Sequence, residues 1–149
     1  MALIEIKQGV QADPDIEAKV LEEIHRTEAE SLTTVISFRL ATLRRVRALD
    51  SNIPLGLDFT RPLLAIRRAK FVGARVALPH WALATPRFIR RAHKAGLQVY
   101  AWTVNQPAAM QRKTLHGVDG ILTNYPARLA EVRAGLVPVS ADSAEWRSD

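Results

Sequence analysis

Residues 85–105 read TPRFIRRAHKAGLQVYAWTVN and contain one complete helix signal followed by one strand signal. Thr85 and Pro86 are typical of a helix start, and Gly96 is typical of a left-handed helix stop. Between them, apolar residues recur at helical spacing: Phe88, Ile89 and Ala92. The run 97–102 that follows is mostly apolar and aromatic, which predicts a strand. The stretch therefore predicts a helix that leads directly into a strand.

The same alternation extends in both directions along the chain. Short apolar runs predict six strands, at residues 3–6, 33–38, 53–57, 74–78, 97–102 and 119–123. Their starts lie 30, 20, 21, 23 and 22 residues apart, which is one strand and one helix per step. Strict alternation predicts an α/β protein with parallel strands, either an open doubly wound sheet or a (β/α)8 barrel. No glycine-rich phosphate loop follows any of the strands, which argues against a nucleotide-binding open sheet.

Six amphipathic stretches between the strands predict helices. Their expected starts are Asp13, Leu40, Thr60, Thr85, Asn105 and Tyr125. The third helix is expected to bury Leu63 and Ile66, and Asn105 is expected to cap the fifth. Residues 137–149 are small and polar and are interpreted as a flexible tail, so the folded domain is expected to occupy residues 1–136.

The composition is that of one globular domain. The 149 residues are 48% hydrophobic and 24% charged. The chain has no cysteine, which excludes disulfides, thiolate zinc sites and cysteine nucleophiles. No stretch approaches the roughly 20 apolar residues of a membrane helix, and the first residues are charged where a signal peptide is apolar. We therefore expect a soluble protein without a membrane span, cytoplasmic by default.

The net charge of +6 arises from 21 basic and 15 acidic residues that are scattered along the chain. The densest basic clusters, around residues 67–70 and 87–94, alternate with apolar residues at helical spacing. This pattern is typical of solvated helix faces. We expect no nucleic-acid partner, because the basic residues form no stripe interleaved with aromatic side chains.

Polar and aromatic side chains near the ends of the predicted strands are candidate site residues. Glu5 and Lys7 lie two residues apart and therefore share one face of the first strand. Taken by themselves, these two residues predict an exposed ion pair on a strand at the edge of the sheet. Trp102 ends its strand, either as a pocket wall or as part of the core. His80 follows a strand, and we expect it either to contact substrate or to be a loop residue without a chemical role. The other histidines, at positions 25, 93 and 116, are expected on the outer surface.

Four motifs resemble the glycerophosphodiester phosphodiesterase family. Residues 96–105 (GLQVYAWTVN) and 117–126 (GVDGILTNYP) resemble its last two strands in sequence and spacing. Residues 4–7 (IEIK) are similar to its third strand, and Ser37 and Phe38 to the end of its fourth. The resemblance implies an incomplete TIM barrel of six βα units, strands three to eight.

The resemblance also implies an activity, the metal-dependent hydrolysis of glycerophosphodiesters to glycerol 3-phosphate and an alcohol. It implies that Glu5 is a ligand of a divalent metal, Ca²⁺ or Mg²⁺, and that Lys7 helps to hold the phosphodiester of the small-molecule substrate. The strand-end positions of Phe38 and Trp102 suggest that their rings contact the glycerol or alcohol group of that substrate, with a place in the core as the alternative. The family's His-Arg motif, its Glu-x-Asp pair and a further histidine belong to the first two strands and have no counterpart here. We therefore assign no catalytic residue and expect the isolated chain to be inactive. Asn124 stands where the family has aspartate.

A non-catalytic binding or assembly module derived from the same barrel is the alternative interpretation. An incomplete barrel leaves its first and last strands unpaired, and unpaired edges associate with other chains. On this interpretation the chain forms homo-oligomers or binds a partner through its open sheet edges.

Overall fold

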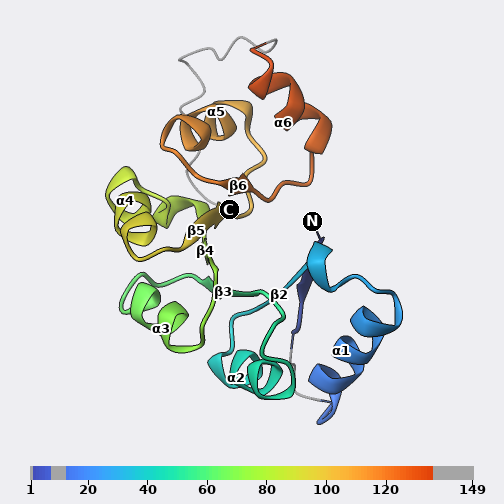
Figure 1. Cartoon of the computed structure of the whole chain (residues 1–149). Helices are drawn as coiled ribbons and strands as arrows, with labels where there is room; N and C mark the ends of the chain where they lie inside the picture. The colour runs from blue at the N-terminus through green and yellow to red at the C-terminus, as the bar shows by residue number, and fades with distance from the viewer. Residues whose placement is uncertain (1, 8–12, 136–149) are drawn as a thin grey trace.

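The computed structural model describes residues 2–7 and 13–135, and these form one curled parallel sheet with helices on its outside (Figure 1). The strands are β1 (Ala2–Glu5), β2 (Thr33–Ser37), β3 (Leu55–Phe59), β4 (Val76–Pro79), β5 (Gln98–Ala101) and β6 (Gly120–Ile121). The helices are α1 (Ile16–Arg26), α2 (Leu40–Leu49), α3 (Ala65–Phe71), α4 (Pro86–Lys94), α5 (Pro107–Leu115) and α6 (Pro126–Arg133), with short 3-10 turns at Glu30–Leu32 and Trp81–Leu83.

The order of the strands in the sheet is the order of the strands in the chain, from β1 to β6, and each neighbouring pair is parallel. An open doubly wound sheet reverses its strand order at a switch point, and this sheet does not. Of the two folds compatible with the strand spacing, the structure therefore has the barrel type, as an incomplete TIM-like barrel. Among the described residues, β1 pairs only with β2 and β6 only with β5.

Both faces of β2, β3 and β4 are buried, as the side-chain alternation of a barrel strand requires, whereas β1 and β6 at the two edges are only partly buried. Side chains on the convex face pack against the helices, and these include Ile6, Val35, Leu55, Leu57, Ala77 and Val99. Side chains on the concave face pack against one another; the buried ones are Ile36, Val76, Leu78 and Tyr100. A Cβ on Gly56 would lie 2.6 Å from Leu78 Cδ1 and 2.9 Å from Ile36 Cγ2, so the inner packing requires glycine there. The interior below the strand ends is thus filled.

Most predicted elements are found within two residues of their expected bounds, and two deviations matter. Strand β3 covers Leu55–Phe59 rather than residues 53–57, so Asp58 belongs to the strand. The third helix was predicted to start at Thr60, and this is wrong, because α3 starts at Ala65 after Leu64 adopts a positive φ of 60°. Leu63, expected in the core, is 75% exposed in the loop that precedes the helix.

The helix signals of residues 85–96 are confirmed in detail. Thr85 Oγ1 accepts a hydrogen bond from the Phe88 backbone N–H at 3.2 Å, and Pro86 is the first residue of α4. Gly96 has a φ of 75°, the left-handed conformation expected of a helix stop. At the first helix the cap differs, because Asp13 Oδ1 accepts from the Asp15 N–H at 2.9 Å and α1 starts at Ile16.

No helix in the described ranges 2–7 and 13–135 has the length and apolar character needed to cross a membrane. The predicted boundary between the domain and a polar tail lies outside the described residues.

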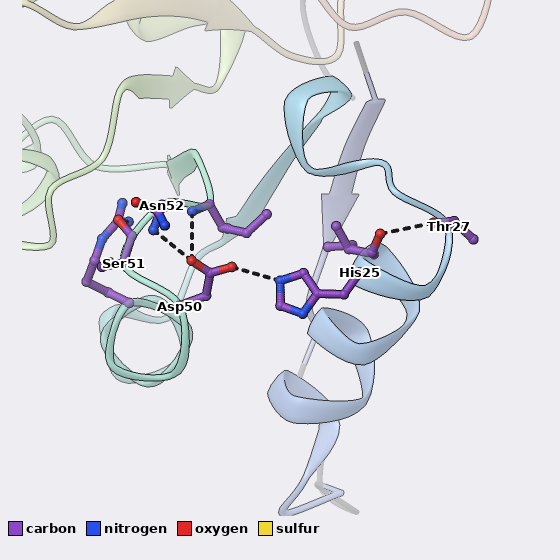
Figure 2. A network of polar contacts seen from close by, with 8 residues as sticks. His25, Thr27, Asp50, Ser51 and Asn52 are labelled. Carbon is purple, nitrogen blue, oxygen red and sulfur yellow. Dashed lines mark hydrogen bonds and ion pairs between the residues drawn. The ribbon is translucent and has the colours of Figure 1, made fainter.

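Asp50, which follows α2, links α1 to the turn before β3 (Figure 2). Its Oδ1 accepts hydrogen bonds from the backbone N–H groups of Asn52 at 2.7 Å and Ile53 at 3.3 Å, and its Oδ2 lies 2.9 Å from His25 Nε2. The Asn52 N–H and the His25 side chain hold the pKa of the Asp50 carboxyl below its usual value. The ionised carboxylate thus fixes the position of the turn.

We expect Asp50→Ala to lower the free energy of unfolding by about 1–2 kcal/mol at pH 7, because three hydrogen bonds to an ionised group are lost. Folding lowers the pKa of Asp50, so its contribution is present above the unfolded-state pKa and is lost as the pH falls through the folded-state value. Urea denaturation at pH 7 and pH 3.5 checks this, with exposed Glu22→Ala as the control. An equal deficit at both pH values would contradict the assignment.

Candidate functional site

A concave pocket of about 460 Å³ lies at the carboxyl ends of the strands, above the filled interior. Parallel α/β barrels hold their active sites at this end. The pocket is lined by Glu5, Ile6, Lys7, Ile36, Ser37, Phe38, Arg39, Asp58, Trp102, Thr103 and Leu122. All four predicted site residues, Glu5, Lys7, Phe38 and Trp102, are therefore brought together, although their individual roles remain predictions.

Glu5 ends β1 and faces the pocket together with Lys7. Lys7 Nζ lies 3.4 Å from Glu5 Oε2, and the side chains are 78% and 28% exposed respectively. Ile6, between them, is buried in the core against the helices. Ser37 Oγ donates a hydrogen bond of 2.8 Å to the Ile6 carbonyl, which holds the end of β1 against β2. The two charged groups are thus carried on a fixed strand end.

Phe38 and Trp102 form an aromatic wall of the pocket. Their ring centroids lie 5.3 Å apart with the planes 84° from parallel, an edge-to-face contact. Trp102 Nε1 donates a hydrogen bond of 2.8 Å to the Leu78 carbonyl, which fixes the indole ring. Phe38 is 46% exposed, so this wall presents apolar surface to solvent.

Asp58, on β3, is the pocket residue that the sequence analysis missed. It is only 4% exposed, lines the pocket, and its Oδ2 is buried without a hydrogen-bond partner among the described residues. Burial raises the pKa of the Asp58 carboxyl to about 7; the negative charge of Glu5 adds to this rise and Lys7 opposes it. The available signal was one acidic residue in the otherwise apolar run 55–59, two residues after the inward-facing Gly56.

None of the described histidines lines the pocket. His80 lies at the same end of the sheet, with its ring centroid 5.5 Å from that of Trp102, and its Nδ1 accepts from the Ala82 N–H at 3.4 Å. The other three lie on the outer helices or beside them, as expected. Their partners are Asp50 for His25, Asp119 for His93 at 2.7 Å and the Ala84 carbonyl for His116 at 3.5 Å.

Asn105 does not cap the fifth helix, contrary to the prediction. Gln106 occupies the position before α5 and makes no side-chain cap. Asn105 Oδ1 instead accepts hydrogen bonds from Thr123 Oγ1 at 3.2 Å and from the Asn124 N–H at 3.0 Å. The amide therefore joins the loop after β5 to the loop after β6, and Asn124 takes part through its backbone.

The pocket brings together two carboxyl groups, of Glu5 and Asp58, and the ammonium group of Lys7. Glu5 and Asp58 offer carboxylate oxygens, the ligands that Ca²⁺ and Mg²⁺ prefer. Within the described residues no group of three or more His, Cys, Asp or Glu forms a complete metal cage. The unpartnered Asp58 Oδ2 nevertheless fits a cation ligand, because a buried carboxylate oxygen is costly without a partner. Lys7 carries a positive charge into the same pocket.

We expect Asp58→Asn to stabilise the fold at pH 8 in the presence of EDTA. Folding raises the Asp58 pKa from 3.8 to about 7, so the folded state holds the proton more tightly and stability falls as the pH rises between these values. Asparagine carries no such penalty, and the variant should be more stable by about 1 kcal/mol or more at pH 8 but not at pH 4. Thermal unfolding at both pH values measures this. A gain that does not depend on pH would contradict the buried-carboxylate account.

Comparison with known proteins agrees with this geometry. The sequence model of the glycerophosphoryl diester phosphodiesterase family matches residues 1–128. The glycerophosphodiester phosphodiesterase of Caldanaerobacter subterraneus is 31% identical over 134 residues, which cover 89% of this chain and 55% of that protein. The chain therefore spans about half the length of this relative.

Solved structures share the fold. A protein from Silicibacter pomeroyi assigned to the glycerophosphoryl diester phosphodiesterases superposes with a TM-score of 0.82 at 28% identity, over 92% of this chain and 52% of that one. A phosphodiesterase from Oleispira antarctica, solved with its product sn-glycerol-3-phosphate, has the same fold with a TM-score of 0.80 at 19% identity, over 87% and 53%. On the match to the family's sequence model, supported by the barrel topology, the chain belongs to the glycerophosphoryl diester phosphodiesterase family.

Proposed function

We propose that this protein takes part in the hydrolysis of glycerophosphodiesters to glycerol 3-phosphate and an alcohol. The observation that carries the proposal is the pocket itself, which gathers carboxylates, a lysine and an aromatic wall at the strand ends of a chain of this family. The name of the Caldanaerobacter relative supports the same reaction. Because the chain spans about half of that relative, the complete reaction is proposed for the whole protein rather than for this segment.

Lys7 is proposed to bind the phosphodiester anion. Its ammonium group is well exposed at the pocket, and its contact with Glu5 at 3.4 Å is longer than a tight ion pair. The side chain can therefore turn toward a phosphoryl oxygen without breaking a strong interaction. A charge-assisted hydrogen bond of this kind contributes about 1.5–3 kcal/mol.

Phe38 and Trp102 are proposed to contact the glycerol or alcohol group of the substrate. The indole is held by its hydrogen bond to the Leu78 carbonyl, so the wall needs little ordering when a substrate binds. An apolar face beside charged groups suits a molecule with a phosphodiester at its centre and carbon chains on either side.

Glu5 is proposed as a ligand of a divalent cation, Ca²⁺ or Mg²⁺. Such a cation, when bound, neutralises negative charge on the phosphoryl oxygens. The position of Glu5 supports this role, because the carboxylate faces the pocket from a strand end held by the Ser37 hydrogen bond. In the bound complex, Lys7 then contacts the phosphodiester anion and Glu5 contacts the cation.

Hydrolysis also requires that water be activated and that the leaving oxygen be protonated. No histidine of the described residues lines the pocket. We therefore propose that the chain on its own binds substrate and cation with little or no turnover. The assembly alternative would use the outer edges of β1 and β6, which among the described residues pair only with β2 and β5; the proposal above rests instead on the pocket.

Substitution of Lys7 by alanine is expected to weaken binding of glycerophosphocholine about tenfold or more, the equivalent of at least about 1.4 kcal/mol. Titration followed by tryptophan fluorescence, in the presence of Ca²⁺ or Mg²⁺, measures the effect. Lys70→Ala is the matched control, because Lys70 is an exposed lysine of α3 outside the pocket. Equal affinities of the wild type and Lys7→Ala would exclude the proposed role.

Release of glycerol 3-phosphate from a panel of glycerophosphodiesters tests the reaction itself. We expect background release from this chain, with or without Ca²⁺ or Mg²⁺, and no further loss in Glu5→Ala. Release by the wild type that disappears in Glu5→Ala would show that the pocket is complete as it stands. That result would agree with the proposed phosphodiesterase reaction and contradict the proposal that the isolated chain is inactive.

A further inference from the structure

We propose that Asp58 is a second cation ligand, which acts together with Glu5 in the pocket at the strand ends. The proposal rests on the cation assigned to Glu5 in the proposed function and extends it to a residue on another strand. It is carried by three observations, namely the unpartnered carboxylate oxygen, the register of the strands and the position of Lys7.

The first observation is a buried oxygen without a partner. Asp58 is 4% exposed, and its Oδ2 accepts no hydrogen bond from residues 2–7 and 13–135, which the structure describes. A buried, unsatisfied polar group destabilises a fold by about 1–3 kcal/mol, and a charged one by more. The group lines an open pocket rather than the filled interior, so a ligand can reach it. A bound cation would compensate the carboxylate oxygen, for which the described part of the chain supplies no partner.

The second observation is the register of the sheet. Glu5 on β1 is paired with Ile36 on β2, and Ile36 with Gly56 on β3, so Glu5 and Gly56 lie at the same level. Asp58 lies two residues beyond Gly56, on the same face and one step nearer the strand ends. Strands β1 and β3 lie about 10 Å apart, which is two strand spacings. Both carboxylates lie on the concave face of the sheet and line the same pocket. Carboxylates so placed can share one cation.

The third observation is that a positively charged side chain already lies beside one of these carboxylates. Lys7 Nζ lies 3.4 Å from Glu5 Oε2, and Lys7 lines the same pocket as Asp58. The Lys7 side chain is 78% exposed, so it can turn away from Glu5 without leaving an empty space in the core. We infer that Lys7 competes with a metal ion for the two carboxylates and moves away when the ion binds.

Terbium luminescence on the full chain tests the proposal. Tb³⁺ is a hard cation that occupies calcium-type oxygen sites, and Trp102 lines the same pocket, so excitation of tryptophan reports on an ion bound there. Affinity is measured for the wild type, Glu5→Gln, Asp58→Asn and the control Glu22→Gln, which removes an exposed carboxylate of α1. Ca²⁺ and Mg²⁺ are then used to displace Tb³⁺. Circular dichroism confirms that each variant is folded.

We expect both Glu5→Gln and Asp58→Asn to weaken Tb³⁺ binding at least tenfold, and Glu22→Gln to leave it unchanged. Lys7→Met should tighten binding several-fold, because a competing charge is removed; a residue with a purely structural role would show no such effect. The proposal fails if Asp58→Asn binds Tb³⁺ within twofold of the wild type, or if the wild type binds none.

The outcomes separate this inference from the proposed function. Loss of binding in Glu5→Gln but not in Asp58→Asn leaves Glu5 as the ligand and overturns only the role of Asp58. Binding that depends on Asp58, in a chain that shows no affinity for glycerophosphodiesters, overturns the proposed function and supports the second ligand.

Discussion

The packing of Ile36, Val76, Leu78 and Tyr100 against one another on the concave face of the sheet supports the rest of the structure. Side chains alternate along each strand, so this inner packing and the outer packing against the helices are parts of one arrangement. Gly56 allows the strands to approach, because a Cβ there would collide with Ile36 and Leu78. The interior is filled up to the strand ends, and only the next residues of each strand remain free to form a pocket.

At these strand ends, stability favours apolar side chains that extend the core, whereas the proposed function requires polar and charged ones. Glu5 and Asp58 continue the inward-facing positions of β1 and β3, where an apolar side chain would extend the core. Asp58 instead has a buried carboxylate oxygen to which no group in the described part of the chain donates a hydrogen bond. Natural sequences retain such destabilising groups mainly where a ligand or a reaction needs them. The aromatic wall and Lys7 lie beside this group, which is why one pocket accounts for the charged and the apolar residues together.

Local sequence signals predicted the fold well, because strand alternation and helix caps are local in origin. Thr85, Pro86 and Gly96 act as predicted, and Glu5 and Lys7 share a face as a strand requires. The third helix was misplaced because a positive φ at Leu64 cannot be recognised from residue type. Asn105 was misassigned because its partners, Thr123 and Asn124, lie on a distant loop.

Asp58 was missed for a related reason, since its importance depends on which strands are neighbours and on where β3 ends. The family resemblance pointed to Glu5 and Lys7, and the strand-end positions to Phe38 and Trp102, but neither indicated a carboxylate on this strand. Anomalous diffraction from crystals of the chain grown with Mn²⁺ tests the central claim most directly. The account predicts one strong peak in the pocket, within coordination distance of carboxylate oxygens of Glu5 and Asp58. Peaks confined to surface carboxylates, with none in the pocket, would contradict it.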